Sequence, residues 1–213
     1  MPFKEIGVVI KLNPTCVNTL APIRAAIADR LGRDAPNNPH VTLYHLKCDE
    51  NSVGDILVAL NNLKIAPFNM HIKGPLYETA GRWIDLKATD EGVQAVHEQV
   101  VNALTPFKVD MLDRVREGYD AMPDATKARA DTWGVPGVMD KYNPHTTLCY
   151  EDAVDSDALK AIVEALQPMA DGLDITCSPF EIIVGELGRY GNIHTVLHTV
   201  ELAGADIPEE VAN

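Results

Sequence analysis

Two short segments of the sequence are nearly identical, and they carry the residue types best suited to acid–base chemistry. Residues 38–43 read NPHVTL and residues 143–148 read NPHTTL, so five of the six positions match. From residue frequencies, a second match of this quality would arise by chance on the order of once in ten thousand. The repeat indicates a duplicated half-domain, with His40 and Thr42 in one copy and His145 and Thr147 in the other.

Two histidines and two hydroxyls around one point suit phosphodiester chemistry. The pKa of a free histidine lies near 6.5, so at neutral pH one can be neutral while its partner is protonated. The neutral ring removes a proton from the attacking water or hydroxyl, and the charged ring protonates the leaving oxygen. Each such transfer contributes typically about 10²–10⁴-fold. The threonine hydroxyls hydrogen-bond the non-bridging oxygens, where negative charge builds up. No carboxylate cluster with ligand spacing accompanies the histidines, so neither a metal nor a cofactor is expected.

The period of a β-strand explains how the four residues meet. Residues i and i+2 of a strand point to the same face, with Cα atoms roughly 6.5–7 Å apart. His40 and Thr42 therefore share one face while Val41 and Leu43 point into the core, and the second copy behaves alike. If the two copies meet about a pseudo-two-fold axis, all four polar side chains face one cleft.

Paired His-x-Thr strands, each preceded by a proline and separated by about a hundred residues, resemble the two-histidine phosphoesterase superfamily. That group includes the bacterial RNA-terminal cyclic phosphodiesterases once called 2′-5′ RNA ligases. The resemblance implies a bilobal α+β fold around a water-filled cleft. It also implies that His40 is the general acid in hydrolysis of a cyclic phosphate and His145 the general base, with Thr42 and Thr147 holding the phosphate. For the reaction that forms a cyclic phosphate, the two histidines exchange roles.

The elements around the motifs predict an α+β fold of antiparallel sheets, two of them around a central cleft with helices outside. A turn at Gly74-Pro75 is expected to separate the third and fourth strands. The predicted strands cover residues 5–12, 40–46, 68–73, 82–88, 145–150, 180–187 and 192–202, and the predicted helices cover 17–31, 52–63, 90–104 and 156–169.

Residues 1–213 are expected to form one bilobal domain of two half-repeats, about 5–88 and 89–202. The segment 106–143 carries proline, glycine and charge without a clean period, apart from a possible helix near 124–133. A connection of this length inside a domain is often functional, so an insertion or lid is expected. Residues 203–213 have the character of a tail.

Aromatic and basic residues near the motifs are further candidates for substrate binding. Tyr44 is expected on the face of His40, and loop aromatics are candidates for stacking on a base, with simple packing as the alternative. Arg189 and Lys141 are candidates for phosphate contacts, with solvated surface charge as the alternative. The loop aromatics are Trp133, Tyr142 and Tyr190.

Several other reactive residues receive structural interpretations. Cys149 is a weaker candidate for a nucleophile, because His145 already has a better role. His194 and His198 would lie roughly 13 Å apart on a strand, too far to share a metal ion. The residues expected to be structural, exposed or at the rim are His45, His71, His97, His194, His198, Arg82 and Trp83.

The composition of the chain limits the substrates and partners that can be expected. Acidic residues outnumber basic ones 31 to 18, for a net charge of −13, and no basic cluster compensates. Proteins that hold long nucleic acids usually carry a basic stripe, so a small nucleotide or short oligonucleotide is the expected substrate. Four widely spaced cysteines and no long apolar run favour a reduced, cytoplasmic protein that does not enter a membrane. A monomer is favoured.

The sequence therefore predicts metal-independent hydrolysis of cyclic phosphodiesters: 2′,3′-cyclic nucleotides, RNA ends, or small cyclic or 2′-5′ oligonucleotides. A non-catalytic nucleotide- or RNA-binding module on the same fold is one alternative, although binding alone needs no matched acid and base. Joining of RNA ends, as by a 2′-5′ RNA ligase, is another, although formation of the bond from a cyclic phosphate is uphill in dilute solution.

Overall fold

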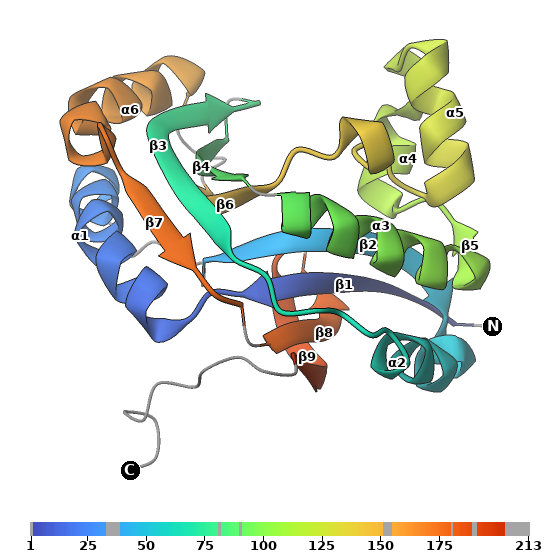
Figure 1. The fold of residues 1–213 in the computed structure, drawn as a ribbon. Coiled ribbons are helices and arrows are strands. Elements are labelled where there is room, and N and C mark those ends of the chain that lie inside the picture. Colours follow the sequence, from blue (N-terminus) through green and yellow to red (C-terminus); the bar gives the residue numbers. More distant parts are fainter. Residues whose placement is uncertain are drawn as a thin grey trace.

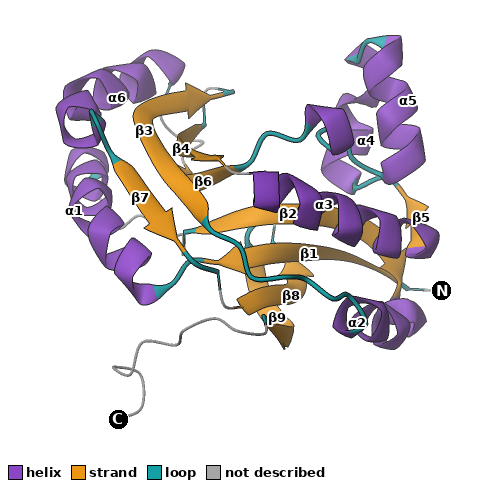
Figure 2. Ribbon diagram, viewed as in Figure 1, coloured by secondary structure: helices purple, strands orange, loops and turns teal. Residues whose placement is uncertain are grey.

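The antiparallel strands of the chain form one sheet with helices packed around it, which confirms the α+β class (Figures 1 and 2). This computed structural model describes residues 2–32, 39–80, 82–89, 91–150, 155–179, 181–188 and 191–202. The strands are β1 (Phe3–Lys11), β2 (His40–Asp49), β3 (Met70–Thr79), β4 (Trp83–Thr89), β5 (Lys108–Asp110), β6 (His145–Tyr150), β7 (Asp174–Cys177), β8 (Glu181–Leu187) and β9 (Ile193–Glu201).

The helices pack in two groups. One group lies beside β3 and β7, and the other lies against β2 and the insertion (Figure 1). The helices are α1 (Pro14–Leu31), α2 (Val53–Asn61), α3 (Glu91–Leu104), α4 (Asp113–Gly118), α5 (Asp124–Trp133) and α6 (Ser156–Ala170). Asn13 accepts a hydrogen bond from the Cys16 N–H at 2.8 Å and so caps α1, which begins at Pro14.

The sheet has two halves, here called arms, which meet at a narrow joint between β6 and β2. Its strand order is β7-β3-β4-β6-β2-β1-β8-β9, with β5 added beside β2. Between β6 and β2, the register within the described residues holds the single pair Val41–Thr146. The two separate sheets expected from sequence are therefore one sheet, because this pair joins them. Each arm also mixes the two ends of the chain, since β4 pairs with β6 and β3 with β7, while β8 pairs with β1 and β9 pairs with β8.

Both motif strands carry a β-bulge directly after the His-x-Thr residues. Val8 and Val9 of β1 oppose Tyr44 and Thr42, so Leu43 is an extra residue in β2. Ile84 and Asp85 of β4 oppose Cys149 and Thr147 in the same way, and Leu148 is the extra residue in β6. A bulge shifts the alternation of side chains along a strand. The residues after each bulge therefore face the opposite way from the prediction.

The strand β3 runs through Gly74-Pro75 instead of turning there, and the chain reverses after Thr79. A Cβ on Gly74 would lie 2.0 Å from the carbonyl oxygen of Ala170, so glycine is needed where the end of α6 approaches the strand. The four-residue strand β7, and β5 and α4 inside the insertion, are further elements that the sequence pattern did not predict.

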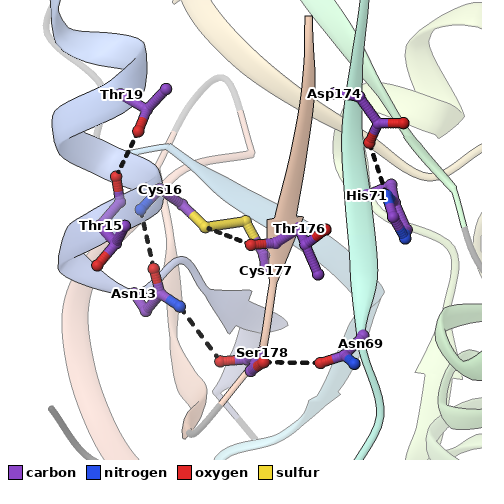
Figure 3. The surroundings of a disulfide bond; sticks show 10 residues. All are labelled: Asn13, Thr15, Cys16, Thr19, Asn69, His71, Asp174, Thr176, Cys177 and Ser178. Carbon is purple, nitrogen blue, oxygen red and sulfur yellow. Dashed lines mark hydrogen bonds and ion pairs between the residues drawn. A yellow bond between two sulfur atoms is a disulfide. The ribbon is translucent and has the colours of Figure 1, made fainter.

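A disulfide between Cys16 and Cys177 joins α1 to β7 (Figure 3). The expectation that all four cysteines are reduced is therefore wrong for this pair. Their 161-residue separation in sequence hid the contact, because widely spaced cysteines give no local signal. Cys48 and Cys149 are free and buried. Over the described ranges, each helix is too short or too polar to cross a membrane.

Candidate active site

The joint between β2 and β6 brings the four motif side chains to one face of the sheet. Val41 and Thr146 are cross-strand partners, and both are 0% exposed. Partners in an antiparallel pair point to the same side, and their neighbours point to the other. His40 and Thr42 therefore emerge on the same face as His145 and Thr147, and all four are partly exposed. The register thus places two imidazoles and two hydroxyls around the joint.

A cavity of about 750 Å³ opens at this face. Thr42 and His145 line it, while His40 and Thr147 lie outside the lining and flank the same joint. One wall comes from the insertion, including α4 and residues 135–138, and another from the β8–β9 connection at Gly188 and Gly191. Cavities of this size hold small organic ligands.

Hydrogen bonds orient the second motif. The Nδ1 atom of His145 lies 2.8 Å from the carbonyl oxygen of Asn143. A carbonyl oxygen only accepts, so Nδ1 carries the proton and Nε2 is the nitrogen that can take one up. The Thr147 hydroxyl donates to Asp85 at 2.7 Å. Asp85 is 1% exposed, and burial raises its pKa, although the bond from Thr147 and the charge of His145 act in the opposite direction.

The carbonyl groups at the first bulge are held by a stacked ring pair. The Tyr142 hydroxyl donates to the Thr42 carbonyl at 2.8 Å, and the Nδ1–H of His97 donates to the Leu43 carbonyl at 2.6 Å. The two rings stack with centroids 3.7 Å apart and an interplanar angle of 1°. The Nε2 of His97 accepts from the Met139 N–H at 2.9 Å, which requires the neutral form, and burial lowers the pKa of His97. His97 thus ties β2 to the end of the insertion.

His45 lines the cavity, contrary to the prediction that it is merely structural or exposed. Gly7 and Val9 share a face of β1, and their partners His45 and Thr42 share that face too, because of the bulge at Leu43. The Nδ1 atom of His45 lies 2.6 Å from Nη2 of Arg114. Burial first, then the charges of Arg114, His40 and His145, lower the pKa of His45 well below 6.5. The motif itself carries no signal for the bulge.

The aromatic wall differs from the predicted one. Trp83 and Tyr150 line the cavity, with ring centroids 5.4 Å apart at 58°, and Tyr142 lines it as well. Tyr44 touches the cavity but is 1% exposed, and its hydroxyl donates to the Trp133 carbonyl at 2.6 Å. Trp133 packs against the hydrophobic core instead of the cavity. The two bulges account for the positions of both tyrosines, because the one at Leu43 turns Tyr44 inward and the one at Leu148 turns Tyr150 toward the cleft.

The remaining candidates do not join the site. Lys141 is exposed and lies 3.8 Å from Asp140. Cys149 is 1% exposed in the core, where a nucleophile would not reach a substrate in the cleft. Arg189 and Tyr190 lie outside the described residues.

Two family profiles each match a part of the chain. The profile of LigT-like phosphoesterases matches residues 10–75, which include the first motif. The profile of the family described as "Protein of unknown function (DUF1045)" matches residues 65–183, which include the insertion and the second motif. None of the curated proteins matches the chain.

Solved structures with the same fold include two bacterial proteins. TT0787 of Thermus thermophilus has 19% sequence identity and a TM-score of 0.59, over 94% of this chain and 99% of that chain. LigT of Escherichia coli, solved in complex with 3′-AMP, has 13% identity and a TM-score of 0.52, over 95% of this chain and 99% of that chain. More than half of the 213 residues match the DUF1045 profile, so the chain belongs to that family of proteins of unknown function, and its fold is that of the LigT-like two-histidine phosphoesterases.

Proposed function

We propose that this protein is a metal-independent phosphodiesterase that opens cyclic phosphodiesters with His40 and His145. The observation that carries the proposal is the joint at Val41–Thr146, which puts both histidines and both threonines on one face beside the cavity. The match to the LigT-like phosphoesterases supports phosphoesterase activity in general.

The steps follow from the tautomer of His145 and from the role of general acid that the resemblance implies for His40. Nε2 of neutral His145 removes a proton from a water molecule, whose oxygen attacks the phosphorus. The bond from phosphorus to the ester oxygen breaks, and protonated His40 gives its proton to that oxygen. The product is a phosphomonoester with a neighbouring hydroxyl. Thr42 donates a hydrogen bond to a non-bridging oxygen as charge builds on it, and Thr147 does the same when Asp85 is protonated and no longer accepts its hydroxyl proton. The Nδ1–H bond from His145 to Asn143 holds the base in the required tautomer.

The cavity supports a nucleotide as the substrate class. Its wall carries the aromatic rings of Trp83 and Tyr150, which suit stacking on a base. LigT has been solved with 3′-AMP, and that nucleotide is a product expected from opening of 2′,3′-cyclic AMP. The net charge of −13 argues against a long RNA and in favour of a mononucleotide or a short oligonucleotide.

The test is hydrolysis of a substrate panel in EDTA by wild type, His40→Ala and His145→Ala. The panel holds 2′,3′-cyclic mononucleotides, 2′-5′ oligonucleotides and cyclic dinucleotides. We expect turnover of at least one cyclic phosphodiester, and a loss of about 10²-fold or more in each variant. His194→Ala, on the exposed part of β9, is the control and is expected to keep wild-type activity. Activity that survives both active-site substitutions would contradict the mechanism, and binding without turnover would favour a nucleotide-binding module.

A further inference from the structure

The insertion delivers a cation into the catalytic cleft. Arg114 lies on α4 and lines the cavity; the residue remains accessible to solvent, while partial desolvation by the surrounding wall lowers its pKa. The proposed mechanism does not use it. A guanidinium remains charged at any physiological pH and offers several N–H donors in a fixed plane, a geometry that suits phosphate oxygens.

Two carboxylates near Arg114 have partners of their own. Glu5 accepts a hydrogen bond from the Asp113 N–H at 2.6 Å, and the Asp113 carboxylate lies 2.5 Å from Lys47. Glu5 does add a favourable longer-range charge interaction, and Glu117 lines the same wall. Within the part of the chain that the structure describes, Arg114 has no carboxylate at salt-bridge distance, so its charge is available to an anion.

Neighbouring residues hold the guanidinium in place. Nη2 donates to Nδ1 of His45 at 2.6 Å, which takes up one of the five N–H donors of a guanidinium that lines the cavity. Gly191 leaves room for this pair, because a Cβ there would lie 2.7 Å from Nη1 of Arg114 and 3.1 Å from Cε1 of His45. The pair is therefore packed into the wall of the cleft beside Gly191.

The distance between Arg114 and the catalytic residues suits contact with a second group of the same substrate. His45 lies three residues beyond Thr42 along β2, which places their Cα atoms about 10 Å apart at most. The charges of His40 and His145 still reach His45. An anion bound to Arg114 therefore lies in the same cleft as a phosphate beside Thr42 and His145, but at a separate, neighbouring position.

We propose that Arg114, oriented by His45, binds a second phosphate of the substrate, next to the one that reacts. The preferred substrate class is then a cyclic phosphodiester with an additional phosphate, such as an oligonucleotide end or a cyclic nucleotide phosphorylated elsewhere. The position of the first phosphate rests on the proposed function, whereas the second contact is measurable by binding alone.

The test compares binding of adenosine 3′-monophosphate and adenosine 3′,5′-bisphosphate by calorimetry. Wild type is expected to bind the bisphosphate about tenfold or more tightly than the monophosphate. Arg114→Ala and Arg114→Gln are expected to remove this preference while monophosphate affinity stays within about threefold. Arg116→Ala is the matched control, because Arg116 lies on the same helix, pairs with Asp110 and does not line the cavity. It is expected to retain the preference.

Three results would overturn the inference. Equal affinities in wild type would mean that there is no second phosphate site. A preference that survives in Arg114→Gln would assign the second phosphate to another cation, such as Arg82. An equal loss for both ligands would mean that Arg114 contacts the reacting phosphate. If hydrolysis fails but the Arg114-dependent preference remains, the proposed function is wrong and the second phosphate site stands.

Discussion

The two halves of the site are alike in their motifs but differ in the residues opposite them. Thr42 has Val9 as its cross-strand partner, whereas Thr147 has Asp85. Asp85 therefore adds a carboxyl group to one side of a site whose histidines and threonines are symmetric. While Asp85 is ionised, the Thr147 hydroxyl donates to it and cannot also donate to a phosphate. A protonated Asp85 could instead donate to Thr147 and free that hydroxyl for the substrate.

Asp85→Asn is expected to stabilise the protein at neutral pH. Because burial raises the pKa of Asp85, the folded state binds more protons than the unfolded state, and wild-type stability falls as pH rises from about 3.9 toward the raised value. Asparagine does not titrate and keeps a hydrogen-bonding partner for Thr147. We expect a gain of roughly 1–2 kcal/mol at pH 8 that shrinks toward pH 4, measured by urea unfolding.

Asp171→Asn, at the exposed end of α6, serves as the charge-matched control for this substitution. It is expected to shift stability by less than about 0.5 kcal/mol. A loss of stability in Asp85→Asn at pH 8 would mean that the ionised carboxylate is needed by the fold.

At the scale of the elements, the bulge at Leu43 and the insertion depend on each other. The bulge exposes the carbonyl groups of Thr42 and Leu43 to partners outside the sheet, and Tyr142 and His97 occupy them. His97 also holds the N–H of Met139, whose φ of 56° is in the left-handed region that a non-glycine residue adopts at a cost. At its other end the insertion pairs β5 with β2, so it contacts β2 at both ends.

His97→Phe is expected to destabilise the protein by about 2–5 kcal/mol. The ring can still stack on Tyr142, but the Leu43 carbonyl and the Met139 N–H lose their partner in a buried site. The measurement is urea unfolding at pH 7.5, with His194→Phe on exposed β9 as the control. Hydrogen exchange at Met139 should become faster in His97→Phe and stay unchanged in the control.

The same residue makes wild-type stability depend on pH. Burial lowers the pKa of His97 in the folded state, so its contribution is complete above the unfolded pKa of about 6.5 and is lost as pH falls toward the lowered value. His45 acts in the same direction. The stability difference between wild type and His97→Phe should therefore narrow from pH 7.5 to pH 5, and a constant difference would contradict a neutral His97.

At the scale of the whole molecule, the disulfide joins two segments that are far apart in the sequence. Cys16 lies in the first helix and Cys177 at the end of β7, so the bond links segments 161 residues apart in sequence. Constraining a loop of 161 residues lowers the entropy of the unfolded state.

Removal of the disulfide is expected to lower the free energy of unfolding by about 2–5 kcal/mol. The measurement is thermal unfolding of wild type with and without dithiothreitol, beside Cys16→Ser/Cys177→Ser, on which the reductant should have no further effect. Alkylation of unreduced, denatured wild type should modify the two free cysteines, Cys48 and Cys149, and reduced protein should be modified at all four. Four modified cysteines without reductant would contradict the disulfide.

The sequence predicted the orientation of some side chains at the site but not of others. The strand period and the repeat placed His40, Thr42, His145 and Thr147 on one face, and the register of β2 and β6 agrees with that arrangement. The period failed for Tyr44 and His45, because a single bulge reverses every side chain that follows it. No local pattern marks such a bulge, since it depends on the register between two strands.

The sequence by itself determined the α+β class and the duplicated motif, because these depend on periodicity and residue type within a few neighbouring positions. Only the tertiary structure decided that one sheet joins the halves, that Asp85 meets Thr147, and that Arg114 of the insertion meets His45. Those contacts join residues 62 and 69 positions apart. They arise from strand register and from the anchoring of an inserted segment, which are properties of the packed chain.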